Sequence, residues 1–215
     1  KTAPDASDYL NACGKEIPEL VLVISYFGIA SDVIPALRAA LPETTLYIKD
    51  CALSYGATLS GKPDGSDADA AFYSFGEGKP LFAAGGGLMA YTRAFAFSRN
   101  ISAAPFITKC KSLYRYLVKS FIVQNRRLYG WFRSLKTKQN MLSPGSGKVQ
   151  HAWVAPEFVL RLLKAKHPSF ASDILKNNQT LASWKEEFIR YGVQVHWDKE
   201  GNGMYTLLLL PDTMN

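Results

Sequence analysis

The hydrophobic pattern of the first fifty residues predicts a strand, a helix and a second strand. Residues 19–26 (ELVLVISY) form an apolar, β-branched run bounded by Pro18 and Gly28, which indicates a buried strand. Apolar residues recur at helical spacing over residues 31–41, and residues 44–48 favour another strand. Strand, helix and strand in this length are typical of a βαβ unit in a small α/β domain.

The next fifty residues are irregular and then alternate. Residues 56–69 are rich in turn formers and predict an exposed loop. Alternation over residues 71–75, 80–84 and 91–98 favours short strands, and the glycine run 85–87 favours a bend between them.

Residues 107–136 predict a long amphipathic helix, in which Gly130 is the weak point because glycine costs about 1 kcal/mol inside a helix. A kink or a division into two helices there is an open alternative. At helical spacing, one face collects Leu113, Leu117, Phe121, Leu128, Trp131, Phe132 and Leu135. The opposite face collects Arg115, Lys119, Arg126 and Arg133, flanked by Lys111 and Lys136.

The last third of the chain predicts a winged helix. A short strand over 149–154 is followed by helices over 157–166, 169–176 and 183–191, the last with Ser183 and Glu186 spaced as a capping box. A β-hairpin over 193–210 follows. Strand, three helices and a closing hairpin is the element order of a winged helix.

Three runs in this region carry a family resemblance: VQHAWVAPEFVLRLL, SWKEEFIRYGV and TLLLLPD. Together they resemble the winged-helix modules that close some replication and mobilisation proteins of plasmids, phages and conjugative elements. The resemblance covers residues 149–215 only, and no catalytic motif of those proteins is present. It implies a role in DNA metabolism.

Charge is distributed very unevenly along the chain. Residues 78–156 contain thirteen Lys and Arg side chains and no Asp or Glu, whereas residues 1–77 carry a net charge of about −6 by direct count. Residues 157–215 are neutral, so the overall net charge of +7 hides a strongly polarised molecule. A basic segment of this kind favours a partner with negative charge.

The predicted nucleic-acid contacts lie on the basic helix and on the recognition helix and wing of the winged helix. The simpler alternative for the helix is a solvated amphipathic surface whose aromatic residues pack inward. The candidate binding residues are Lys111, Arg115, Lys119, Arg126, Arg127, Arg133, Lys136, Lys138, Lys185, Arg190 and Lys199.

Other chemistry has weaker signals. Residues 56–62 match G-x-x-x-x-G-K, but Pro63 replaces the Ser or Thr that would hold magnesium, so a surface turn is expected. Asp64, Asp67 and Asp69 form a cluster of acids that could contact a divalent ion, but such clusters are usually only solvated. The three histidines lack metal-ligand spacing. We therefore expect no cofactor and no metal, and no catalytic residue is identified.

The sequence as a whole predicts an α/β (α+β) protein with an α/β domain over 1–105, a basic helical segment over 106–139, a linker over 140–148 and a winged-helix domain over 149–215. The predicted function is nucleic-acid binding, with DNA favoured over RNA, in a replication, transfer or transcription assembly with other protein subunits. One alternative is a scaffold module that docks on an acidic partner or an anionic membrane. Another is an enzyme with an unrecognised site in 19–105.

Three cysteines without short spacing favour a reduced, cytoplasmic (intracellular) setting. No run of apolar residues is long enough to span a membrane. The chain begins with Lys1 rather than Met, which indicates a fragment or a processed piece.

Overall fold

A computed structural model describes residues 3–76, 78–91, 102–124, 154–191, 193–196, 200–204 and 207–209. The chain divides into two compact units, one formed by Lys1–Ala96 with Leu162–Asn215 and the other by Phe97–Arg161. The domain boundaries that the sequence suggests at 105, 139 and 148 stay predictions. No helix in the described ranges is both long enough and apolar enough to cross a membrane.

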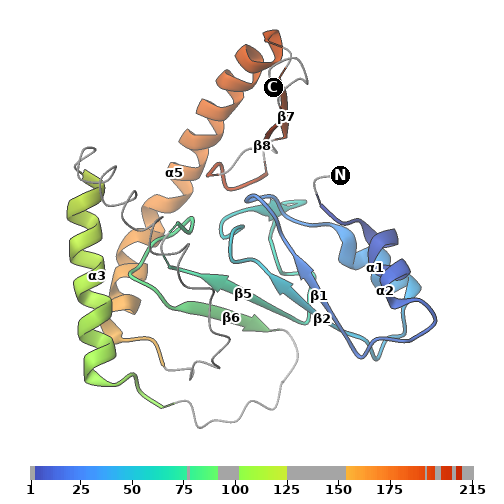
Figure 1. Ribbon diagram of the computed structural model, residues 1–215, viewed down its shortest axis with the longest axis horizontal. Coiled ribbons are helices and arrows are strands. Elements are labelled where there is room, and N and C mark those ends of the chain that lie inside the picture. Colours follow the sequence, from blue (N-terminus) through green and yellow to red (C-terminus); the bar gives the residue numbers. More distant parts are fainter. Residues whose placement is uncertain are drawn as a thin grey trace, which may run out of the picture. The chain divides into compact units, whose positions relative to one another are not determined.

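The first unit is built on a mixed four-stranded sheet with the order β1-β2-β5-β6 (Figure 1). Strands β1 (Leu20–Ile24), β2 (Leu46–Asp50) and β5 (Ala70–Ser74) are parallel, and β6 (Gly87–Tyr91) pairs antiparallel with β5. The predicted βαβ unit is therefore present, because helix α2 (Val33–Ala40) connects β1 to β2. Residues 80–84, predicted as a strand, form bends instead.

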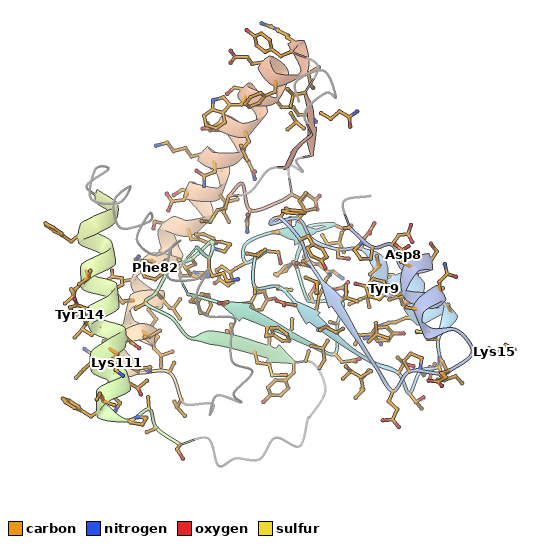
Figure 2. The ribbon with its side chains drawn as sticks, in the orientation of Figure 1. Asp8, Tyr9, Lys15, Phe82, Lys111 and Tyr114 are labelled. Atoms are coloured by element: carbon orange, nitrogen blue, oxygen red, sulfur yellow. The ribbon has the colours of Figure 1, made fainter. Side chains whose placement is uncertain are left out.

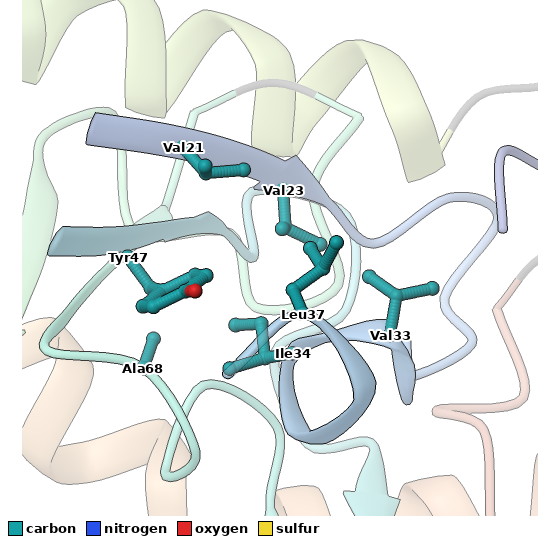
Figure 3. Packing of buried hydrophobic residues seen from close by; sticks show 7 residues of the cluster. All are labelled: Val21, Val23, Val33, Ile34, Leu37, Tyr47 and Ala68. Atoms are coloured by element: carbon teal, nitrogen blue, oxygen red, sulfur yellow. The ribbon is translucent and has the colours of Figure 1, made fainter. Parts of the chain in front are cut away.

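One face of this sheet is packed against helices α1 (Ala6–Cys13) and α2. Val21 and Val23 of β1 and Tyr47 of β2 meet Ile34 and Leu37 of α2 in one buried cluster (Figure 3). Asp5 caps α1, since its side chain accepts the backbone N–H of Asp8. Alternate side chains along β1 and β2 supply this core, as the period of two along a strand requires.

The opposite face of the sheet is much less covered. Leu20 and Leu22 on β1 are 47% and 46% exposed, and Tyr91 on β6 is 54% exposed. Parallel sheets are normally buried on both faces. The register puts Asp50, at the end of β2, on this same open face, beside Ile24 and Phe72.

The predicted winged helix is absent. A single helix, α5 (Glu157–Arg190), runs through both positions at which the sequence suggested a break (Figure 1). The hydroxyl of Ser169 donates to the carbonyl of Lys166, and that of Ser183 donates to Thr180 O, so neither serine acts as an N-cap. The closing hairpin is present as β7 (Gln194–His196) and β8 (Leu207–Leu209).

The segment predicted as an exposed loop over 56–69 is partly structured and partly buried. It contains a small hairpin of β3 (Thr58–Leu59) and β4 (Lys62–Pro63), so the match to a phosphate-binding loop is a surface turn. Asp64 and Asp69 are only 2% and 3% exposed, so the prediction of solvated acids is wrong.

In the second unit, helix α3 (Phe106–Gln124) occupies the first part of the predicted basic helix. The predicted continuation to residue 136, including the open question at Gly130, lies outside the described residues. Residues Ala103 and Val154 form an isolated parallel bridge in the same unit.

Candidate active site at the carboxyl edge of the sheet

Polar side chains gather where the three parallel strands of the first unit end. Ser25 directly follows β1, Asp50 is the last residue of β2, and Ser74 is the last residue of β5. The Ser25 backbone N–H donates to the Asp50 carbonyl at 3.0 Å, so the ends of β1 and β2 are joined at this edge. In open α/β sheets, ligands bind outside the carboxyl ends of the strands.

Asp50 presents a carboxylate at this edge without being sealed in the core. Its side chain is half-buried, and its Oδ1 accepts the backbone N–H of Ala52 at 2.9 Å. The described part of the chain offers its Oδ2 no hydrogen-bond partner. The neighbouring Lys49 points the other way, into the helical layer, because side chains alternate along a strand.

Lys79 lies on the loop that follows β5, the strand next to β2 in the sheet. The backbone of Phe75 joins the start of this loop to its end. Its N–H donates to Gly86 O, and its carbonyl accepts the N–H groups of Ala83 and Gly85. The Lys79 N–H donates to the carbonyl of Gly76, and its side chain is half-buried. The loop thus begins and ends at the carboxyl edge of β5.

Helix α5 supports the same loop from outside. The Lys166 ammonium donates to the Phe82 carbonyl at 3.0 Å and lies 5.6 Å from the centre of the Phe82 ring. Figure 2 labels Phe82 among the side chains of this unit. These contacts hold the far half of the loop that carries Lys79.

A buried ion cluster underlies β2 on the helical side. The Lys49 ammonium is 2.8 Å from Asp64 Oδ1 and 3.0 Å from Asp67 Oδ1, and it donates to the Ser31 carbonyl at 2.6 Å. Burial lowers the pKa of Lys49, but the two carboxylates outweigh it and hold the pKa above its usual value. The hydroxyl of Ser54 donates to the other oxygen of Asp64 at 2.5 Å.

Burial and the nearby Asp64 charge also raise the pKa values of the Cys51 thiol and the Tyr73 phenol. Both groups are therefore neutral near pH 7, and neither is an activated nucleophile. The ion cluster is consequently a structural support of β2 rather than a reactive centre. Within the described ranges, no group of His, Cys, Asp and Glu side chains is arranged to hold a metal ion.

The residues predicted to bind nucleic acid that the structure describes lie on helices α3 and α5. Lys111 is exposed on α3, as Figure 2 shows together with Tyr114, and Arg115 and Lys119 belong to the same helix. Lys185 is half-buried and Arg190 exposed near the end of α5. Outside the described residues lie Arg126, Arg127, Arg133, Lys136, Lys138 and Lys199.

Comparison with known protein families gives a match at the sheet and its edge. Residues 15–98 match the model of the DegT/DnrJ/EryC1/StrS aminotransferase family. This segment includes β1, β2, β5 and β6, together with Asp50, Ser74 and Lys79. No protein with a curated description matches the chain in sequence.

Several solved structures, aminotransferases among them, share the fold. The structure of DesI with its TDP-sugar product is 18% identical, with a TM-score of 0.61 over 98% of this chain and 48% of its own. TlmJ from Streptoalloteichus hindustanus is 12% identical, with a TM-score of 0.62 over 99% and 51%. The putative sugar aminotransferase Spr1654 from Streptococcus pneumoniae, in its PLP form, is 15% identical, with a TM-score of 0.51 over 87% and 47%.

These matches establish an aminotransferase-like fold with a mixed sheet, and the chain spans about half the length of the structures it matches. They overturn the resemblance to replication and mobilisation proteins, because the same C-terminal residues belong to the aminotransferase-like fold. The predicted nucleic-acid binding, the DNA or RNA partner and the scaffold alternative are wrong on the same finding. The match at 15–98 lies largely within 19–105, the range in which the sequence allows an unrecognised enzyme site.

Asp50, Ser74 and Lys79 are not among the functional residues predicted from the sequence. A signal for Asp50 was present, because it lies two residues after the predicted strand at 44–48, which adjoins another predicted parallel strand. Enzymes of the α/β class place functional groups just beyond such strand ends. Ser74 and Lys79 had no comparable signal. These residues lie at the same edge as Asp50 because β5 pairs with β2, and this pairing cannot be predicted across the long segment between the two strands.

Proposed function

We propose that this chain forms the cofactor-binding part of an enzyme that uses pyridoxal 5′-phosphate (PLP) to transfer an amino group to a sugar. The observation that carries the proposal is that Asp50 ends β2 and Lys79 lies on the loop after β5, the parallel strand next to β2, at one edge of the sheet. The family match at 15–98 supports it, as does the PLP form of one structural neighbour.

The side chains at this edge suit the cofactor. PLP enzymes use a lysine amine that bonds to the cofactor and an acidic or basic partner for the pyridine nitrogen. Lys79 is the lysine on the loop after β5, and the carboxylate of Asp50 has an oxygen without a described partner. The expectation of no cofactor, made from the sequence, is therefore replaced by this proposal.

When bound, PLP supplies an electron sink that stabilises negative charge next to the reacting amine. Asp50 would hold a proton on the pyridine nitrogen, because a carboxylate favours a cationic partner within hydrogen-bond reach. The Ala52 N–H fixes the orientation of the Asp50 carboxylate for this task. Lys79 would tether the cofactor and carry protons to and from the reacting carbon.

The substrate in this proposal is a sugar attached to a nucleotide. Support comes from the DesI structure, which contains a TDP-sugar product. The identity to this neighbour is low, so the sugar and the nucleotide are properties to be measured in this chain. The cytoplasmic setting predicted from the cysteines is kept as part of the proposal, and Cys13, Cys51 and Cys110 are all free thiols.

Trapping of the cofactor on the lysine tests the proposal directly. The protein is incubated with PLP, the lysine–cofactor bond is reduced with borohydride, and the modified residue is located by peptide mass spectrometry. We expect the modification at Lys79, and its loss in Lys79→Ala. Lys62→Ala is the matched control, since Lys62 lies on the exposed hairpin strand β4 and should leave the modification unchanged.

Asp50→Asn tests the second half of the pair. Replacing the carboxylate by an isosteric amide removes the negative charge that would stabilise the protonated pyridine nitrogen. We expect PLP to bind more weakly and its visible absorption to shift, while the folded structure is retained. Modification spread over many lysines, or unchanged in Lys79→Ala, would rule out the proposed site.

A further inference from the structure

Residues 200–204, near the end of the chain, contact the carboxyl edge of the sheet. Asn202 is only 2% exposed although it follows a turn. Its backbone N–H donates to the carbonyl of Gly28, which follows β1, at 3.0 Å. Its side-chain Nδ2 donates to the carbonyl of Leu53, which follows β2, at 2.7 Å. One residue therefore joins the two loops that leave the adjacent parallel strands.

The remaining polar groups of Asn202 are also used. Nδ2 lies 3.3 Å from the Tyr55 carbonyl as a second acceptor, and Oδ1 accepts the N–H of Met204 at 3.1 Å. An asparagine amide supplies two donors and an acceptor, which is the set these groups require. An aspartate of the same shape would face two carbonyl oxygens with a negative charge.

The neighbouring Glu200 extends the attachment along the loop after β2. Its carbonyl accepts the Thr58 N–H at 2.8 Å, and its carboxylate Oε2 accepts the Ser60 N–H at 2.9 Å. On the other side, Asn178 of α5 donates to the Gly201 carbonyl at 2.9 Å. The turn at 200–204 is therefore fixed both to helix α5 and to the loop that begins just after Asp50.

Gly28 makes the approach possible. Its φ of +74° lies in the left-handed region, which favours glycine. A Cβ at this position would lie 2.2 Å from Asn202 Oδ1, so with any other residue here the Asn202 amide would have to shift. The close contact depends on both residues.

We propose that Asn202 is a positioning residue that fixes the loops after β1 and β2 and thereby sets the position of the Asp50 carboxylate. Asp50 Oδ1 is held by Ala52, and Ala52 immediately precedes Leu53, whose carbonyl Asn202 holds. Movement of the loop is thus transmitted to Asp50 over two residues. The inference rests on the proposed function, because the consequence of positioning Asp50 is cofactor binding.

Asn202→Asp and Gly28→Ala test the inference from the two sides of the contact. Three properties are measured on each purified protein: the dissociation constant for PLP, the midpoint of urea unfolding without PLP, and amide hydrogen exchange over residues 51–60. We expect each variant to raise the dissociation constant roughly ten-fold, which is the effect of about one lost hydrogen bond. Exchange should become faster at Thr58, whose N–H donates to the Glu200 carbonyl, and at Ser54 and Ala57, whose N–H groups donate to carbonyls within the loop that Asn202 holds.

Two controls separate positioning from a general loss of stability. Ile34→Val trims the core beside α2 and should lower the unfolding midpoint without changing PLP binding or exchange over 51–60. Asn11→Ala removes an exposed asparagine amide from α1 and should change none of the three properties.

The outcomes distinguish the two proposals. If the wild type does not bind PLP, the proposed function fails and the positioning role fails with it. If the wild type binds PLP and both variants bind it equally well, the positioning role alone is overturned. A lower unfolding midpoint with unchanged PLP affinity would make Asn202 a purely structural residue.

Discussion

The Lys49 ammonium lies 2.8 Å from Asp64 Oδ1, and both side chains are almost completely buried, at 0% and 1% exposure. Asp67 adds a second carboxylate at 3.0 Å, so one buried cation serves two acids. Lys49 directly precedes Asp50 on β2, and the cluster therefore anchors the strand that ends at the candidate site. Loss of this cluster should lower the free energy of unfolding more than it changes cofactor chemistry.

Lys49→Met should strongly destabilise the protein. The substitution keeps much of the apolar stem but leaves Asp64 and Asp67 without their cation. Removing one partner of a buried ion pair costs about 3–5 kcal/mol. Urea unfolding followed by circular dichroism measures the loss. Lys62→Met, an exposed lysine on β4, is the control and should change stability by less than about 0.5 kcal/mol. Equal effects of the two substitutions would contradict a buried role for Lys49.

Stability should fall as the pH rises through about 10. The pKa of Lys49 is raised above its ordinary value of 10.5, so the unfolded chain loses this proton first and the native state binds more protons. Burial also raises the pKa values of Tyr47 and Tyr73 above 10.0, which acts in the same direction. The stabilisation is therefore complete below pH 10 and is lost above it. Unfolding midpoints between pH 8 and 11 measure the slope, which should be shallower in Lys49→Met.

The two faces of the sheet should respond differently to truncation. Leu37→Ala removes a fully buried side chain from the cluster under α2 and should cost about 2–5 kcal/mol. Leu22→Ala, on the open face, removes a side chain that is 46% exposed and should cost clearly less. Urea unfolding of both variants gives the comparison. A larger loss for Leu22→Ala would mean that the open face is covered in solution.

The elements that the sequence predicted correctly depend on local patterns. Each of β1, β2 and α2 is specified by a pattern within about ten residues: an apolar run for each strand and apolar residues at helical spacing for the helix. The hairpin of β7 and β8 is specified by a turn sequence between two apolar runs. Pairing of β2 with β5 is different, because nineteen residues separate the two strands, and the β3–β4 hairpin among them has the sequence pattern of a loop. Without that pairing, the sequence could not connect Asp50 with Lys79.

The errors also have physical causes. Asp64 and Asp69 looked solvated because their cations, Lys49 and Arg38, lie far away in sequence, and the fold brings them within 2.8 and 3.2 Å. The acid-free basic segment predicted a ligand site, although charge composition alone indicates an electrostatic field and does not specify a function. Ser169 and Ser183 matched the composition of N-caps, but hydroxyls also bond back to carbonyls one turn earlier inside a helix.

Pro168→Ala tests whether α5 is one continuous helix. Pro168 lies inside α5, where proline lacks the N–H that would donate to the carbonyl four residues earlier. In a continuous helix, alanine restores this bond and should stabilise the protein by about 1–3 kcal/mol with unchanged helix content. Urea unfolding and far-ultraviolet circular dichroism measure both effects. Pro156→Ala is the matched control, because Pro156 precedes the first residue of α5 and no helical bond is missing there. The winged-helix prediction required one helix to end near Pro168 and a second to begin after it. In that case, Pro168→Ala would increase the helix content and would not stabilise the protein by this amount.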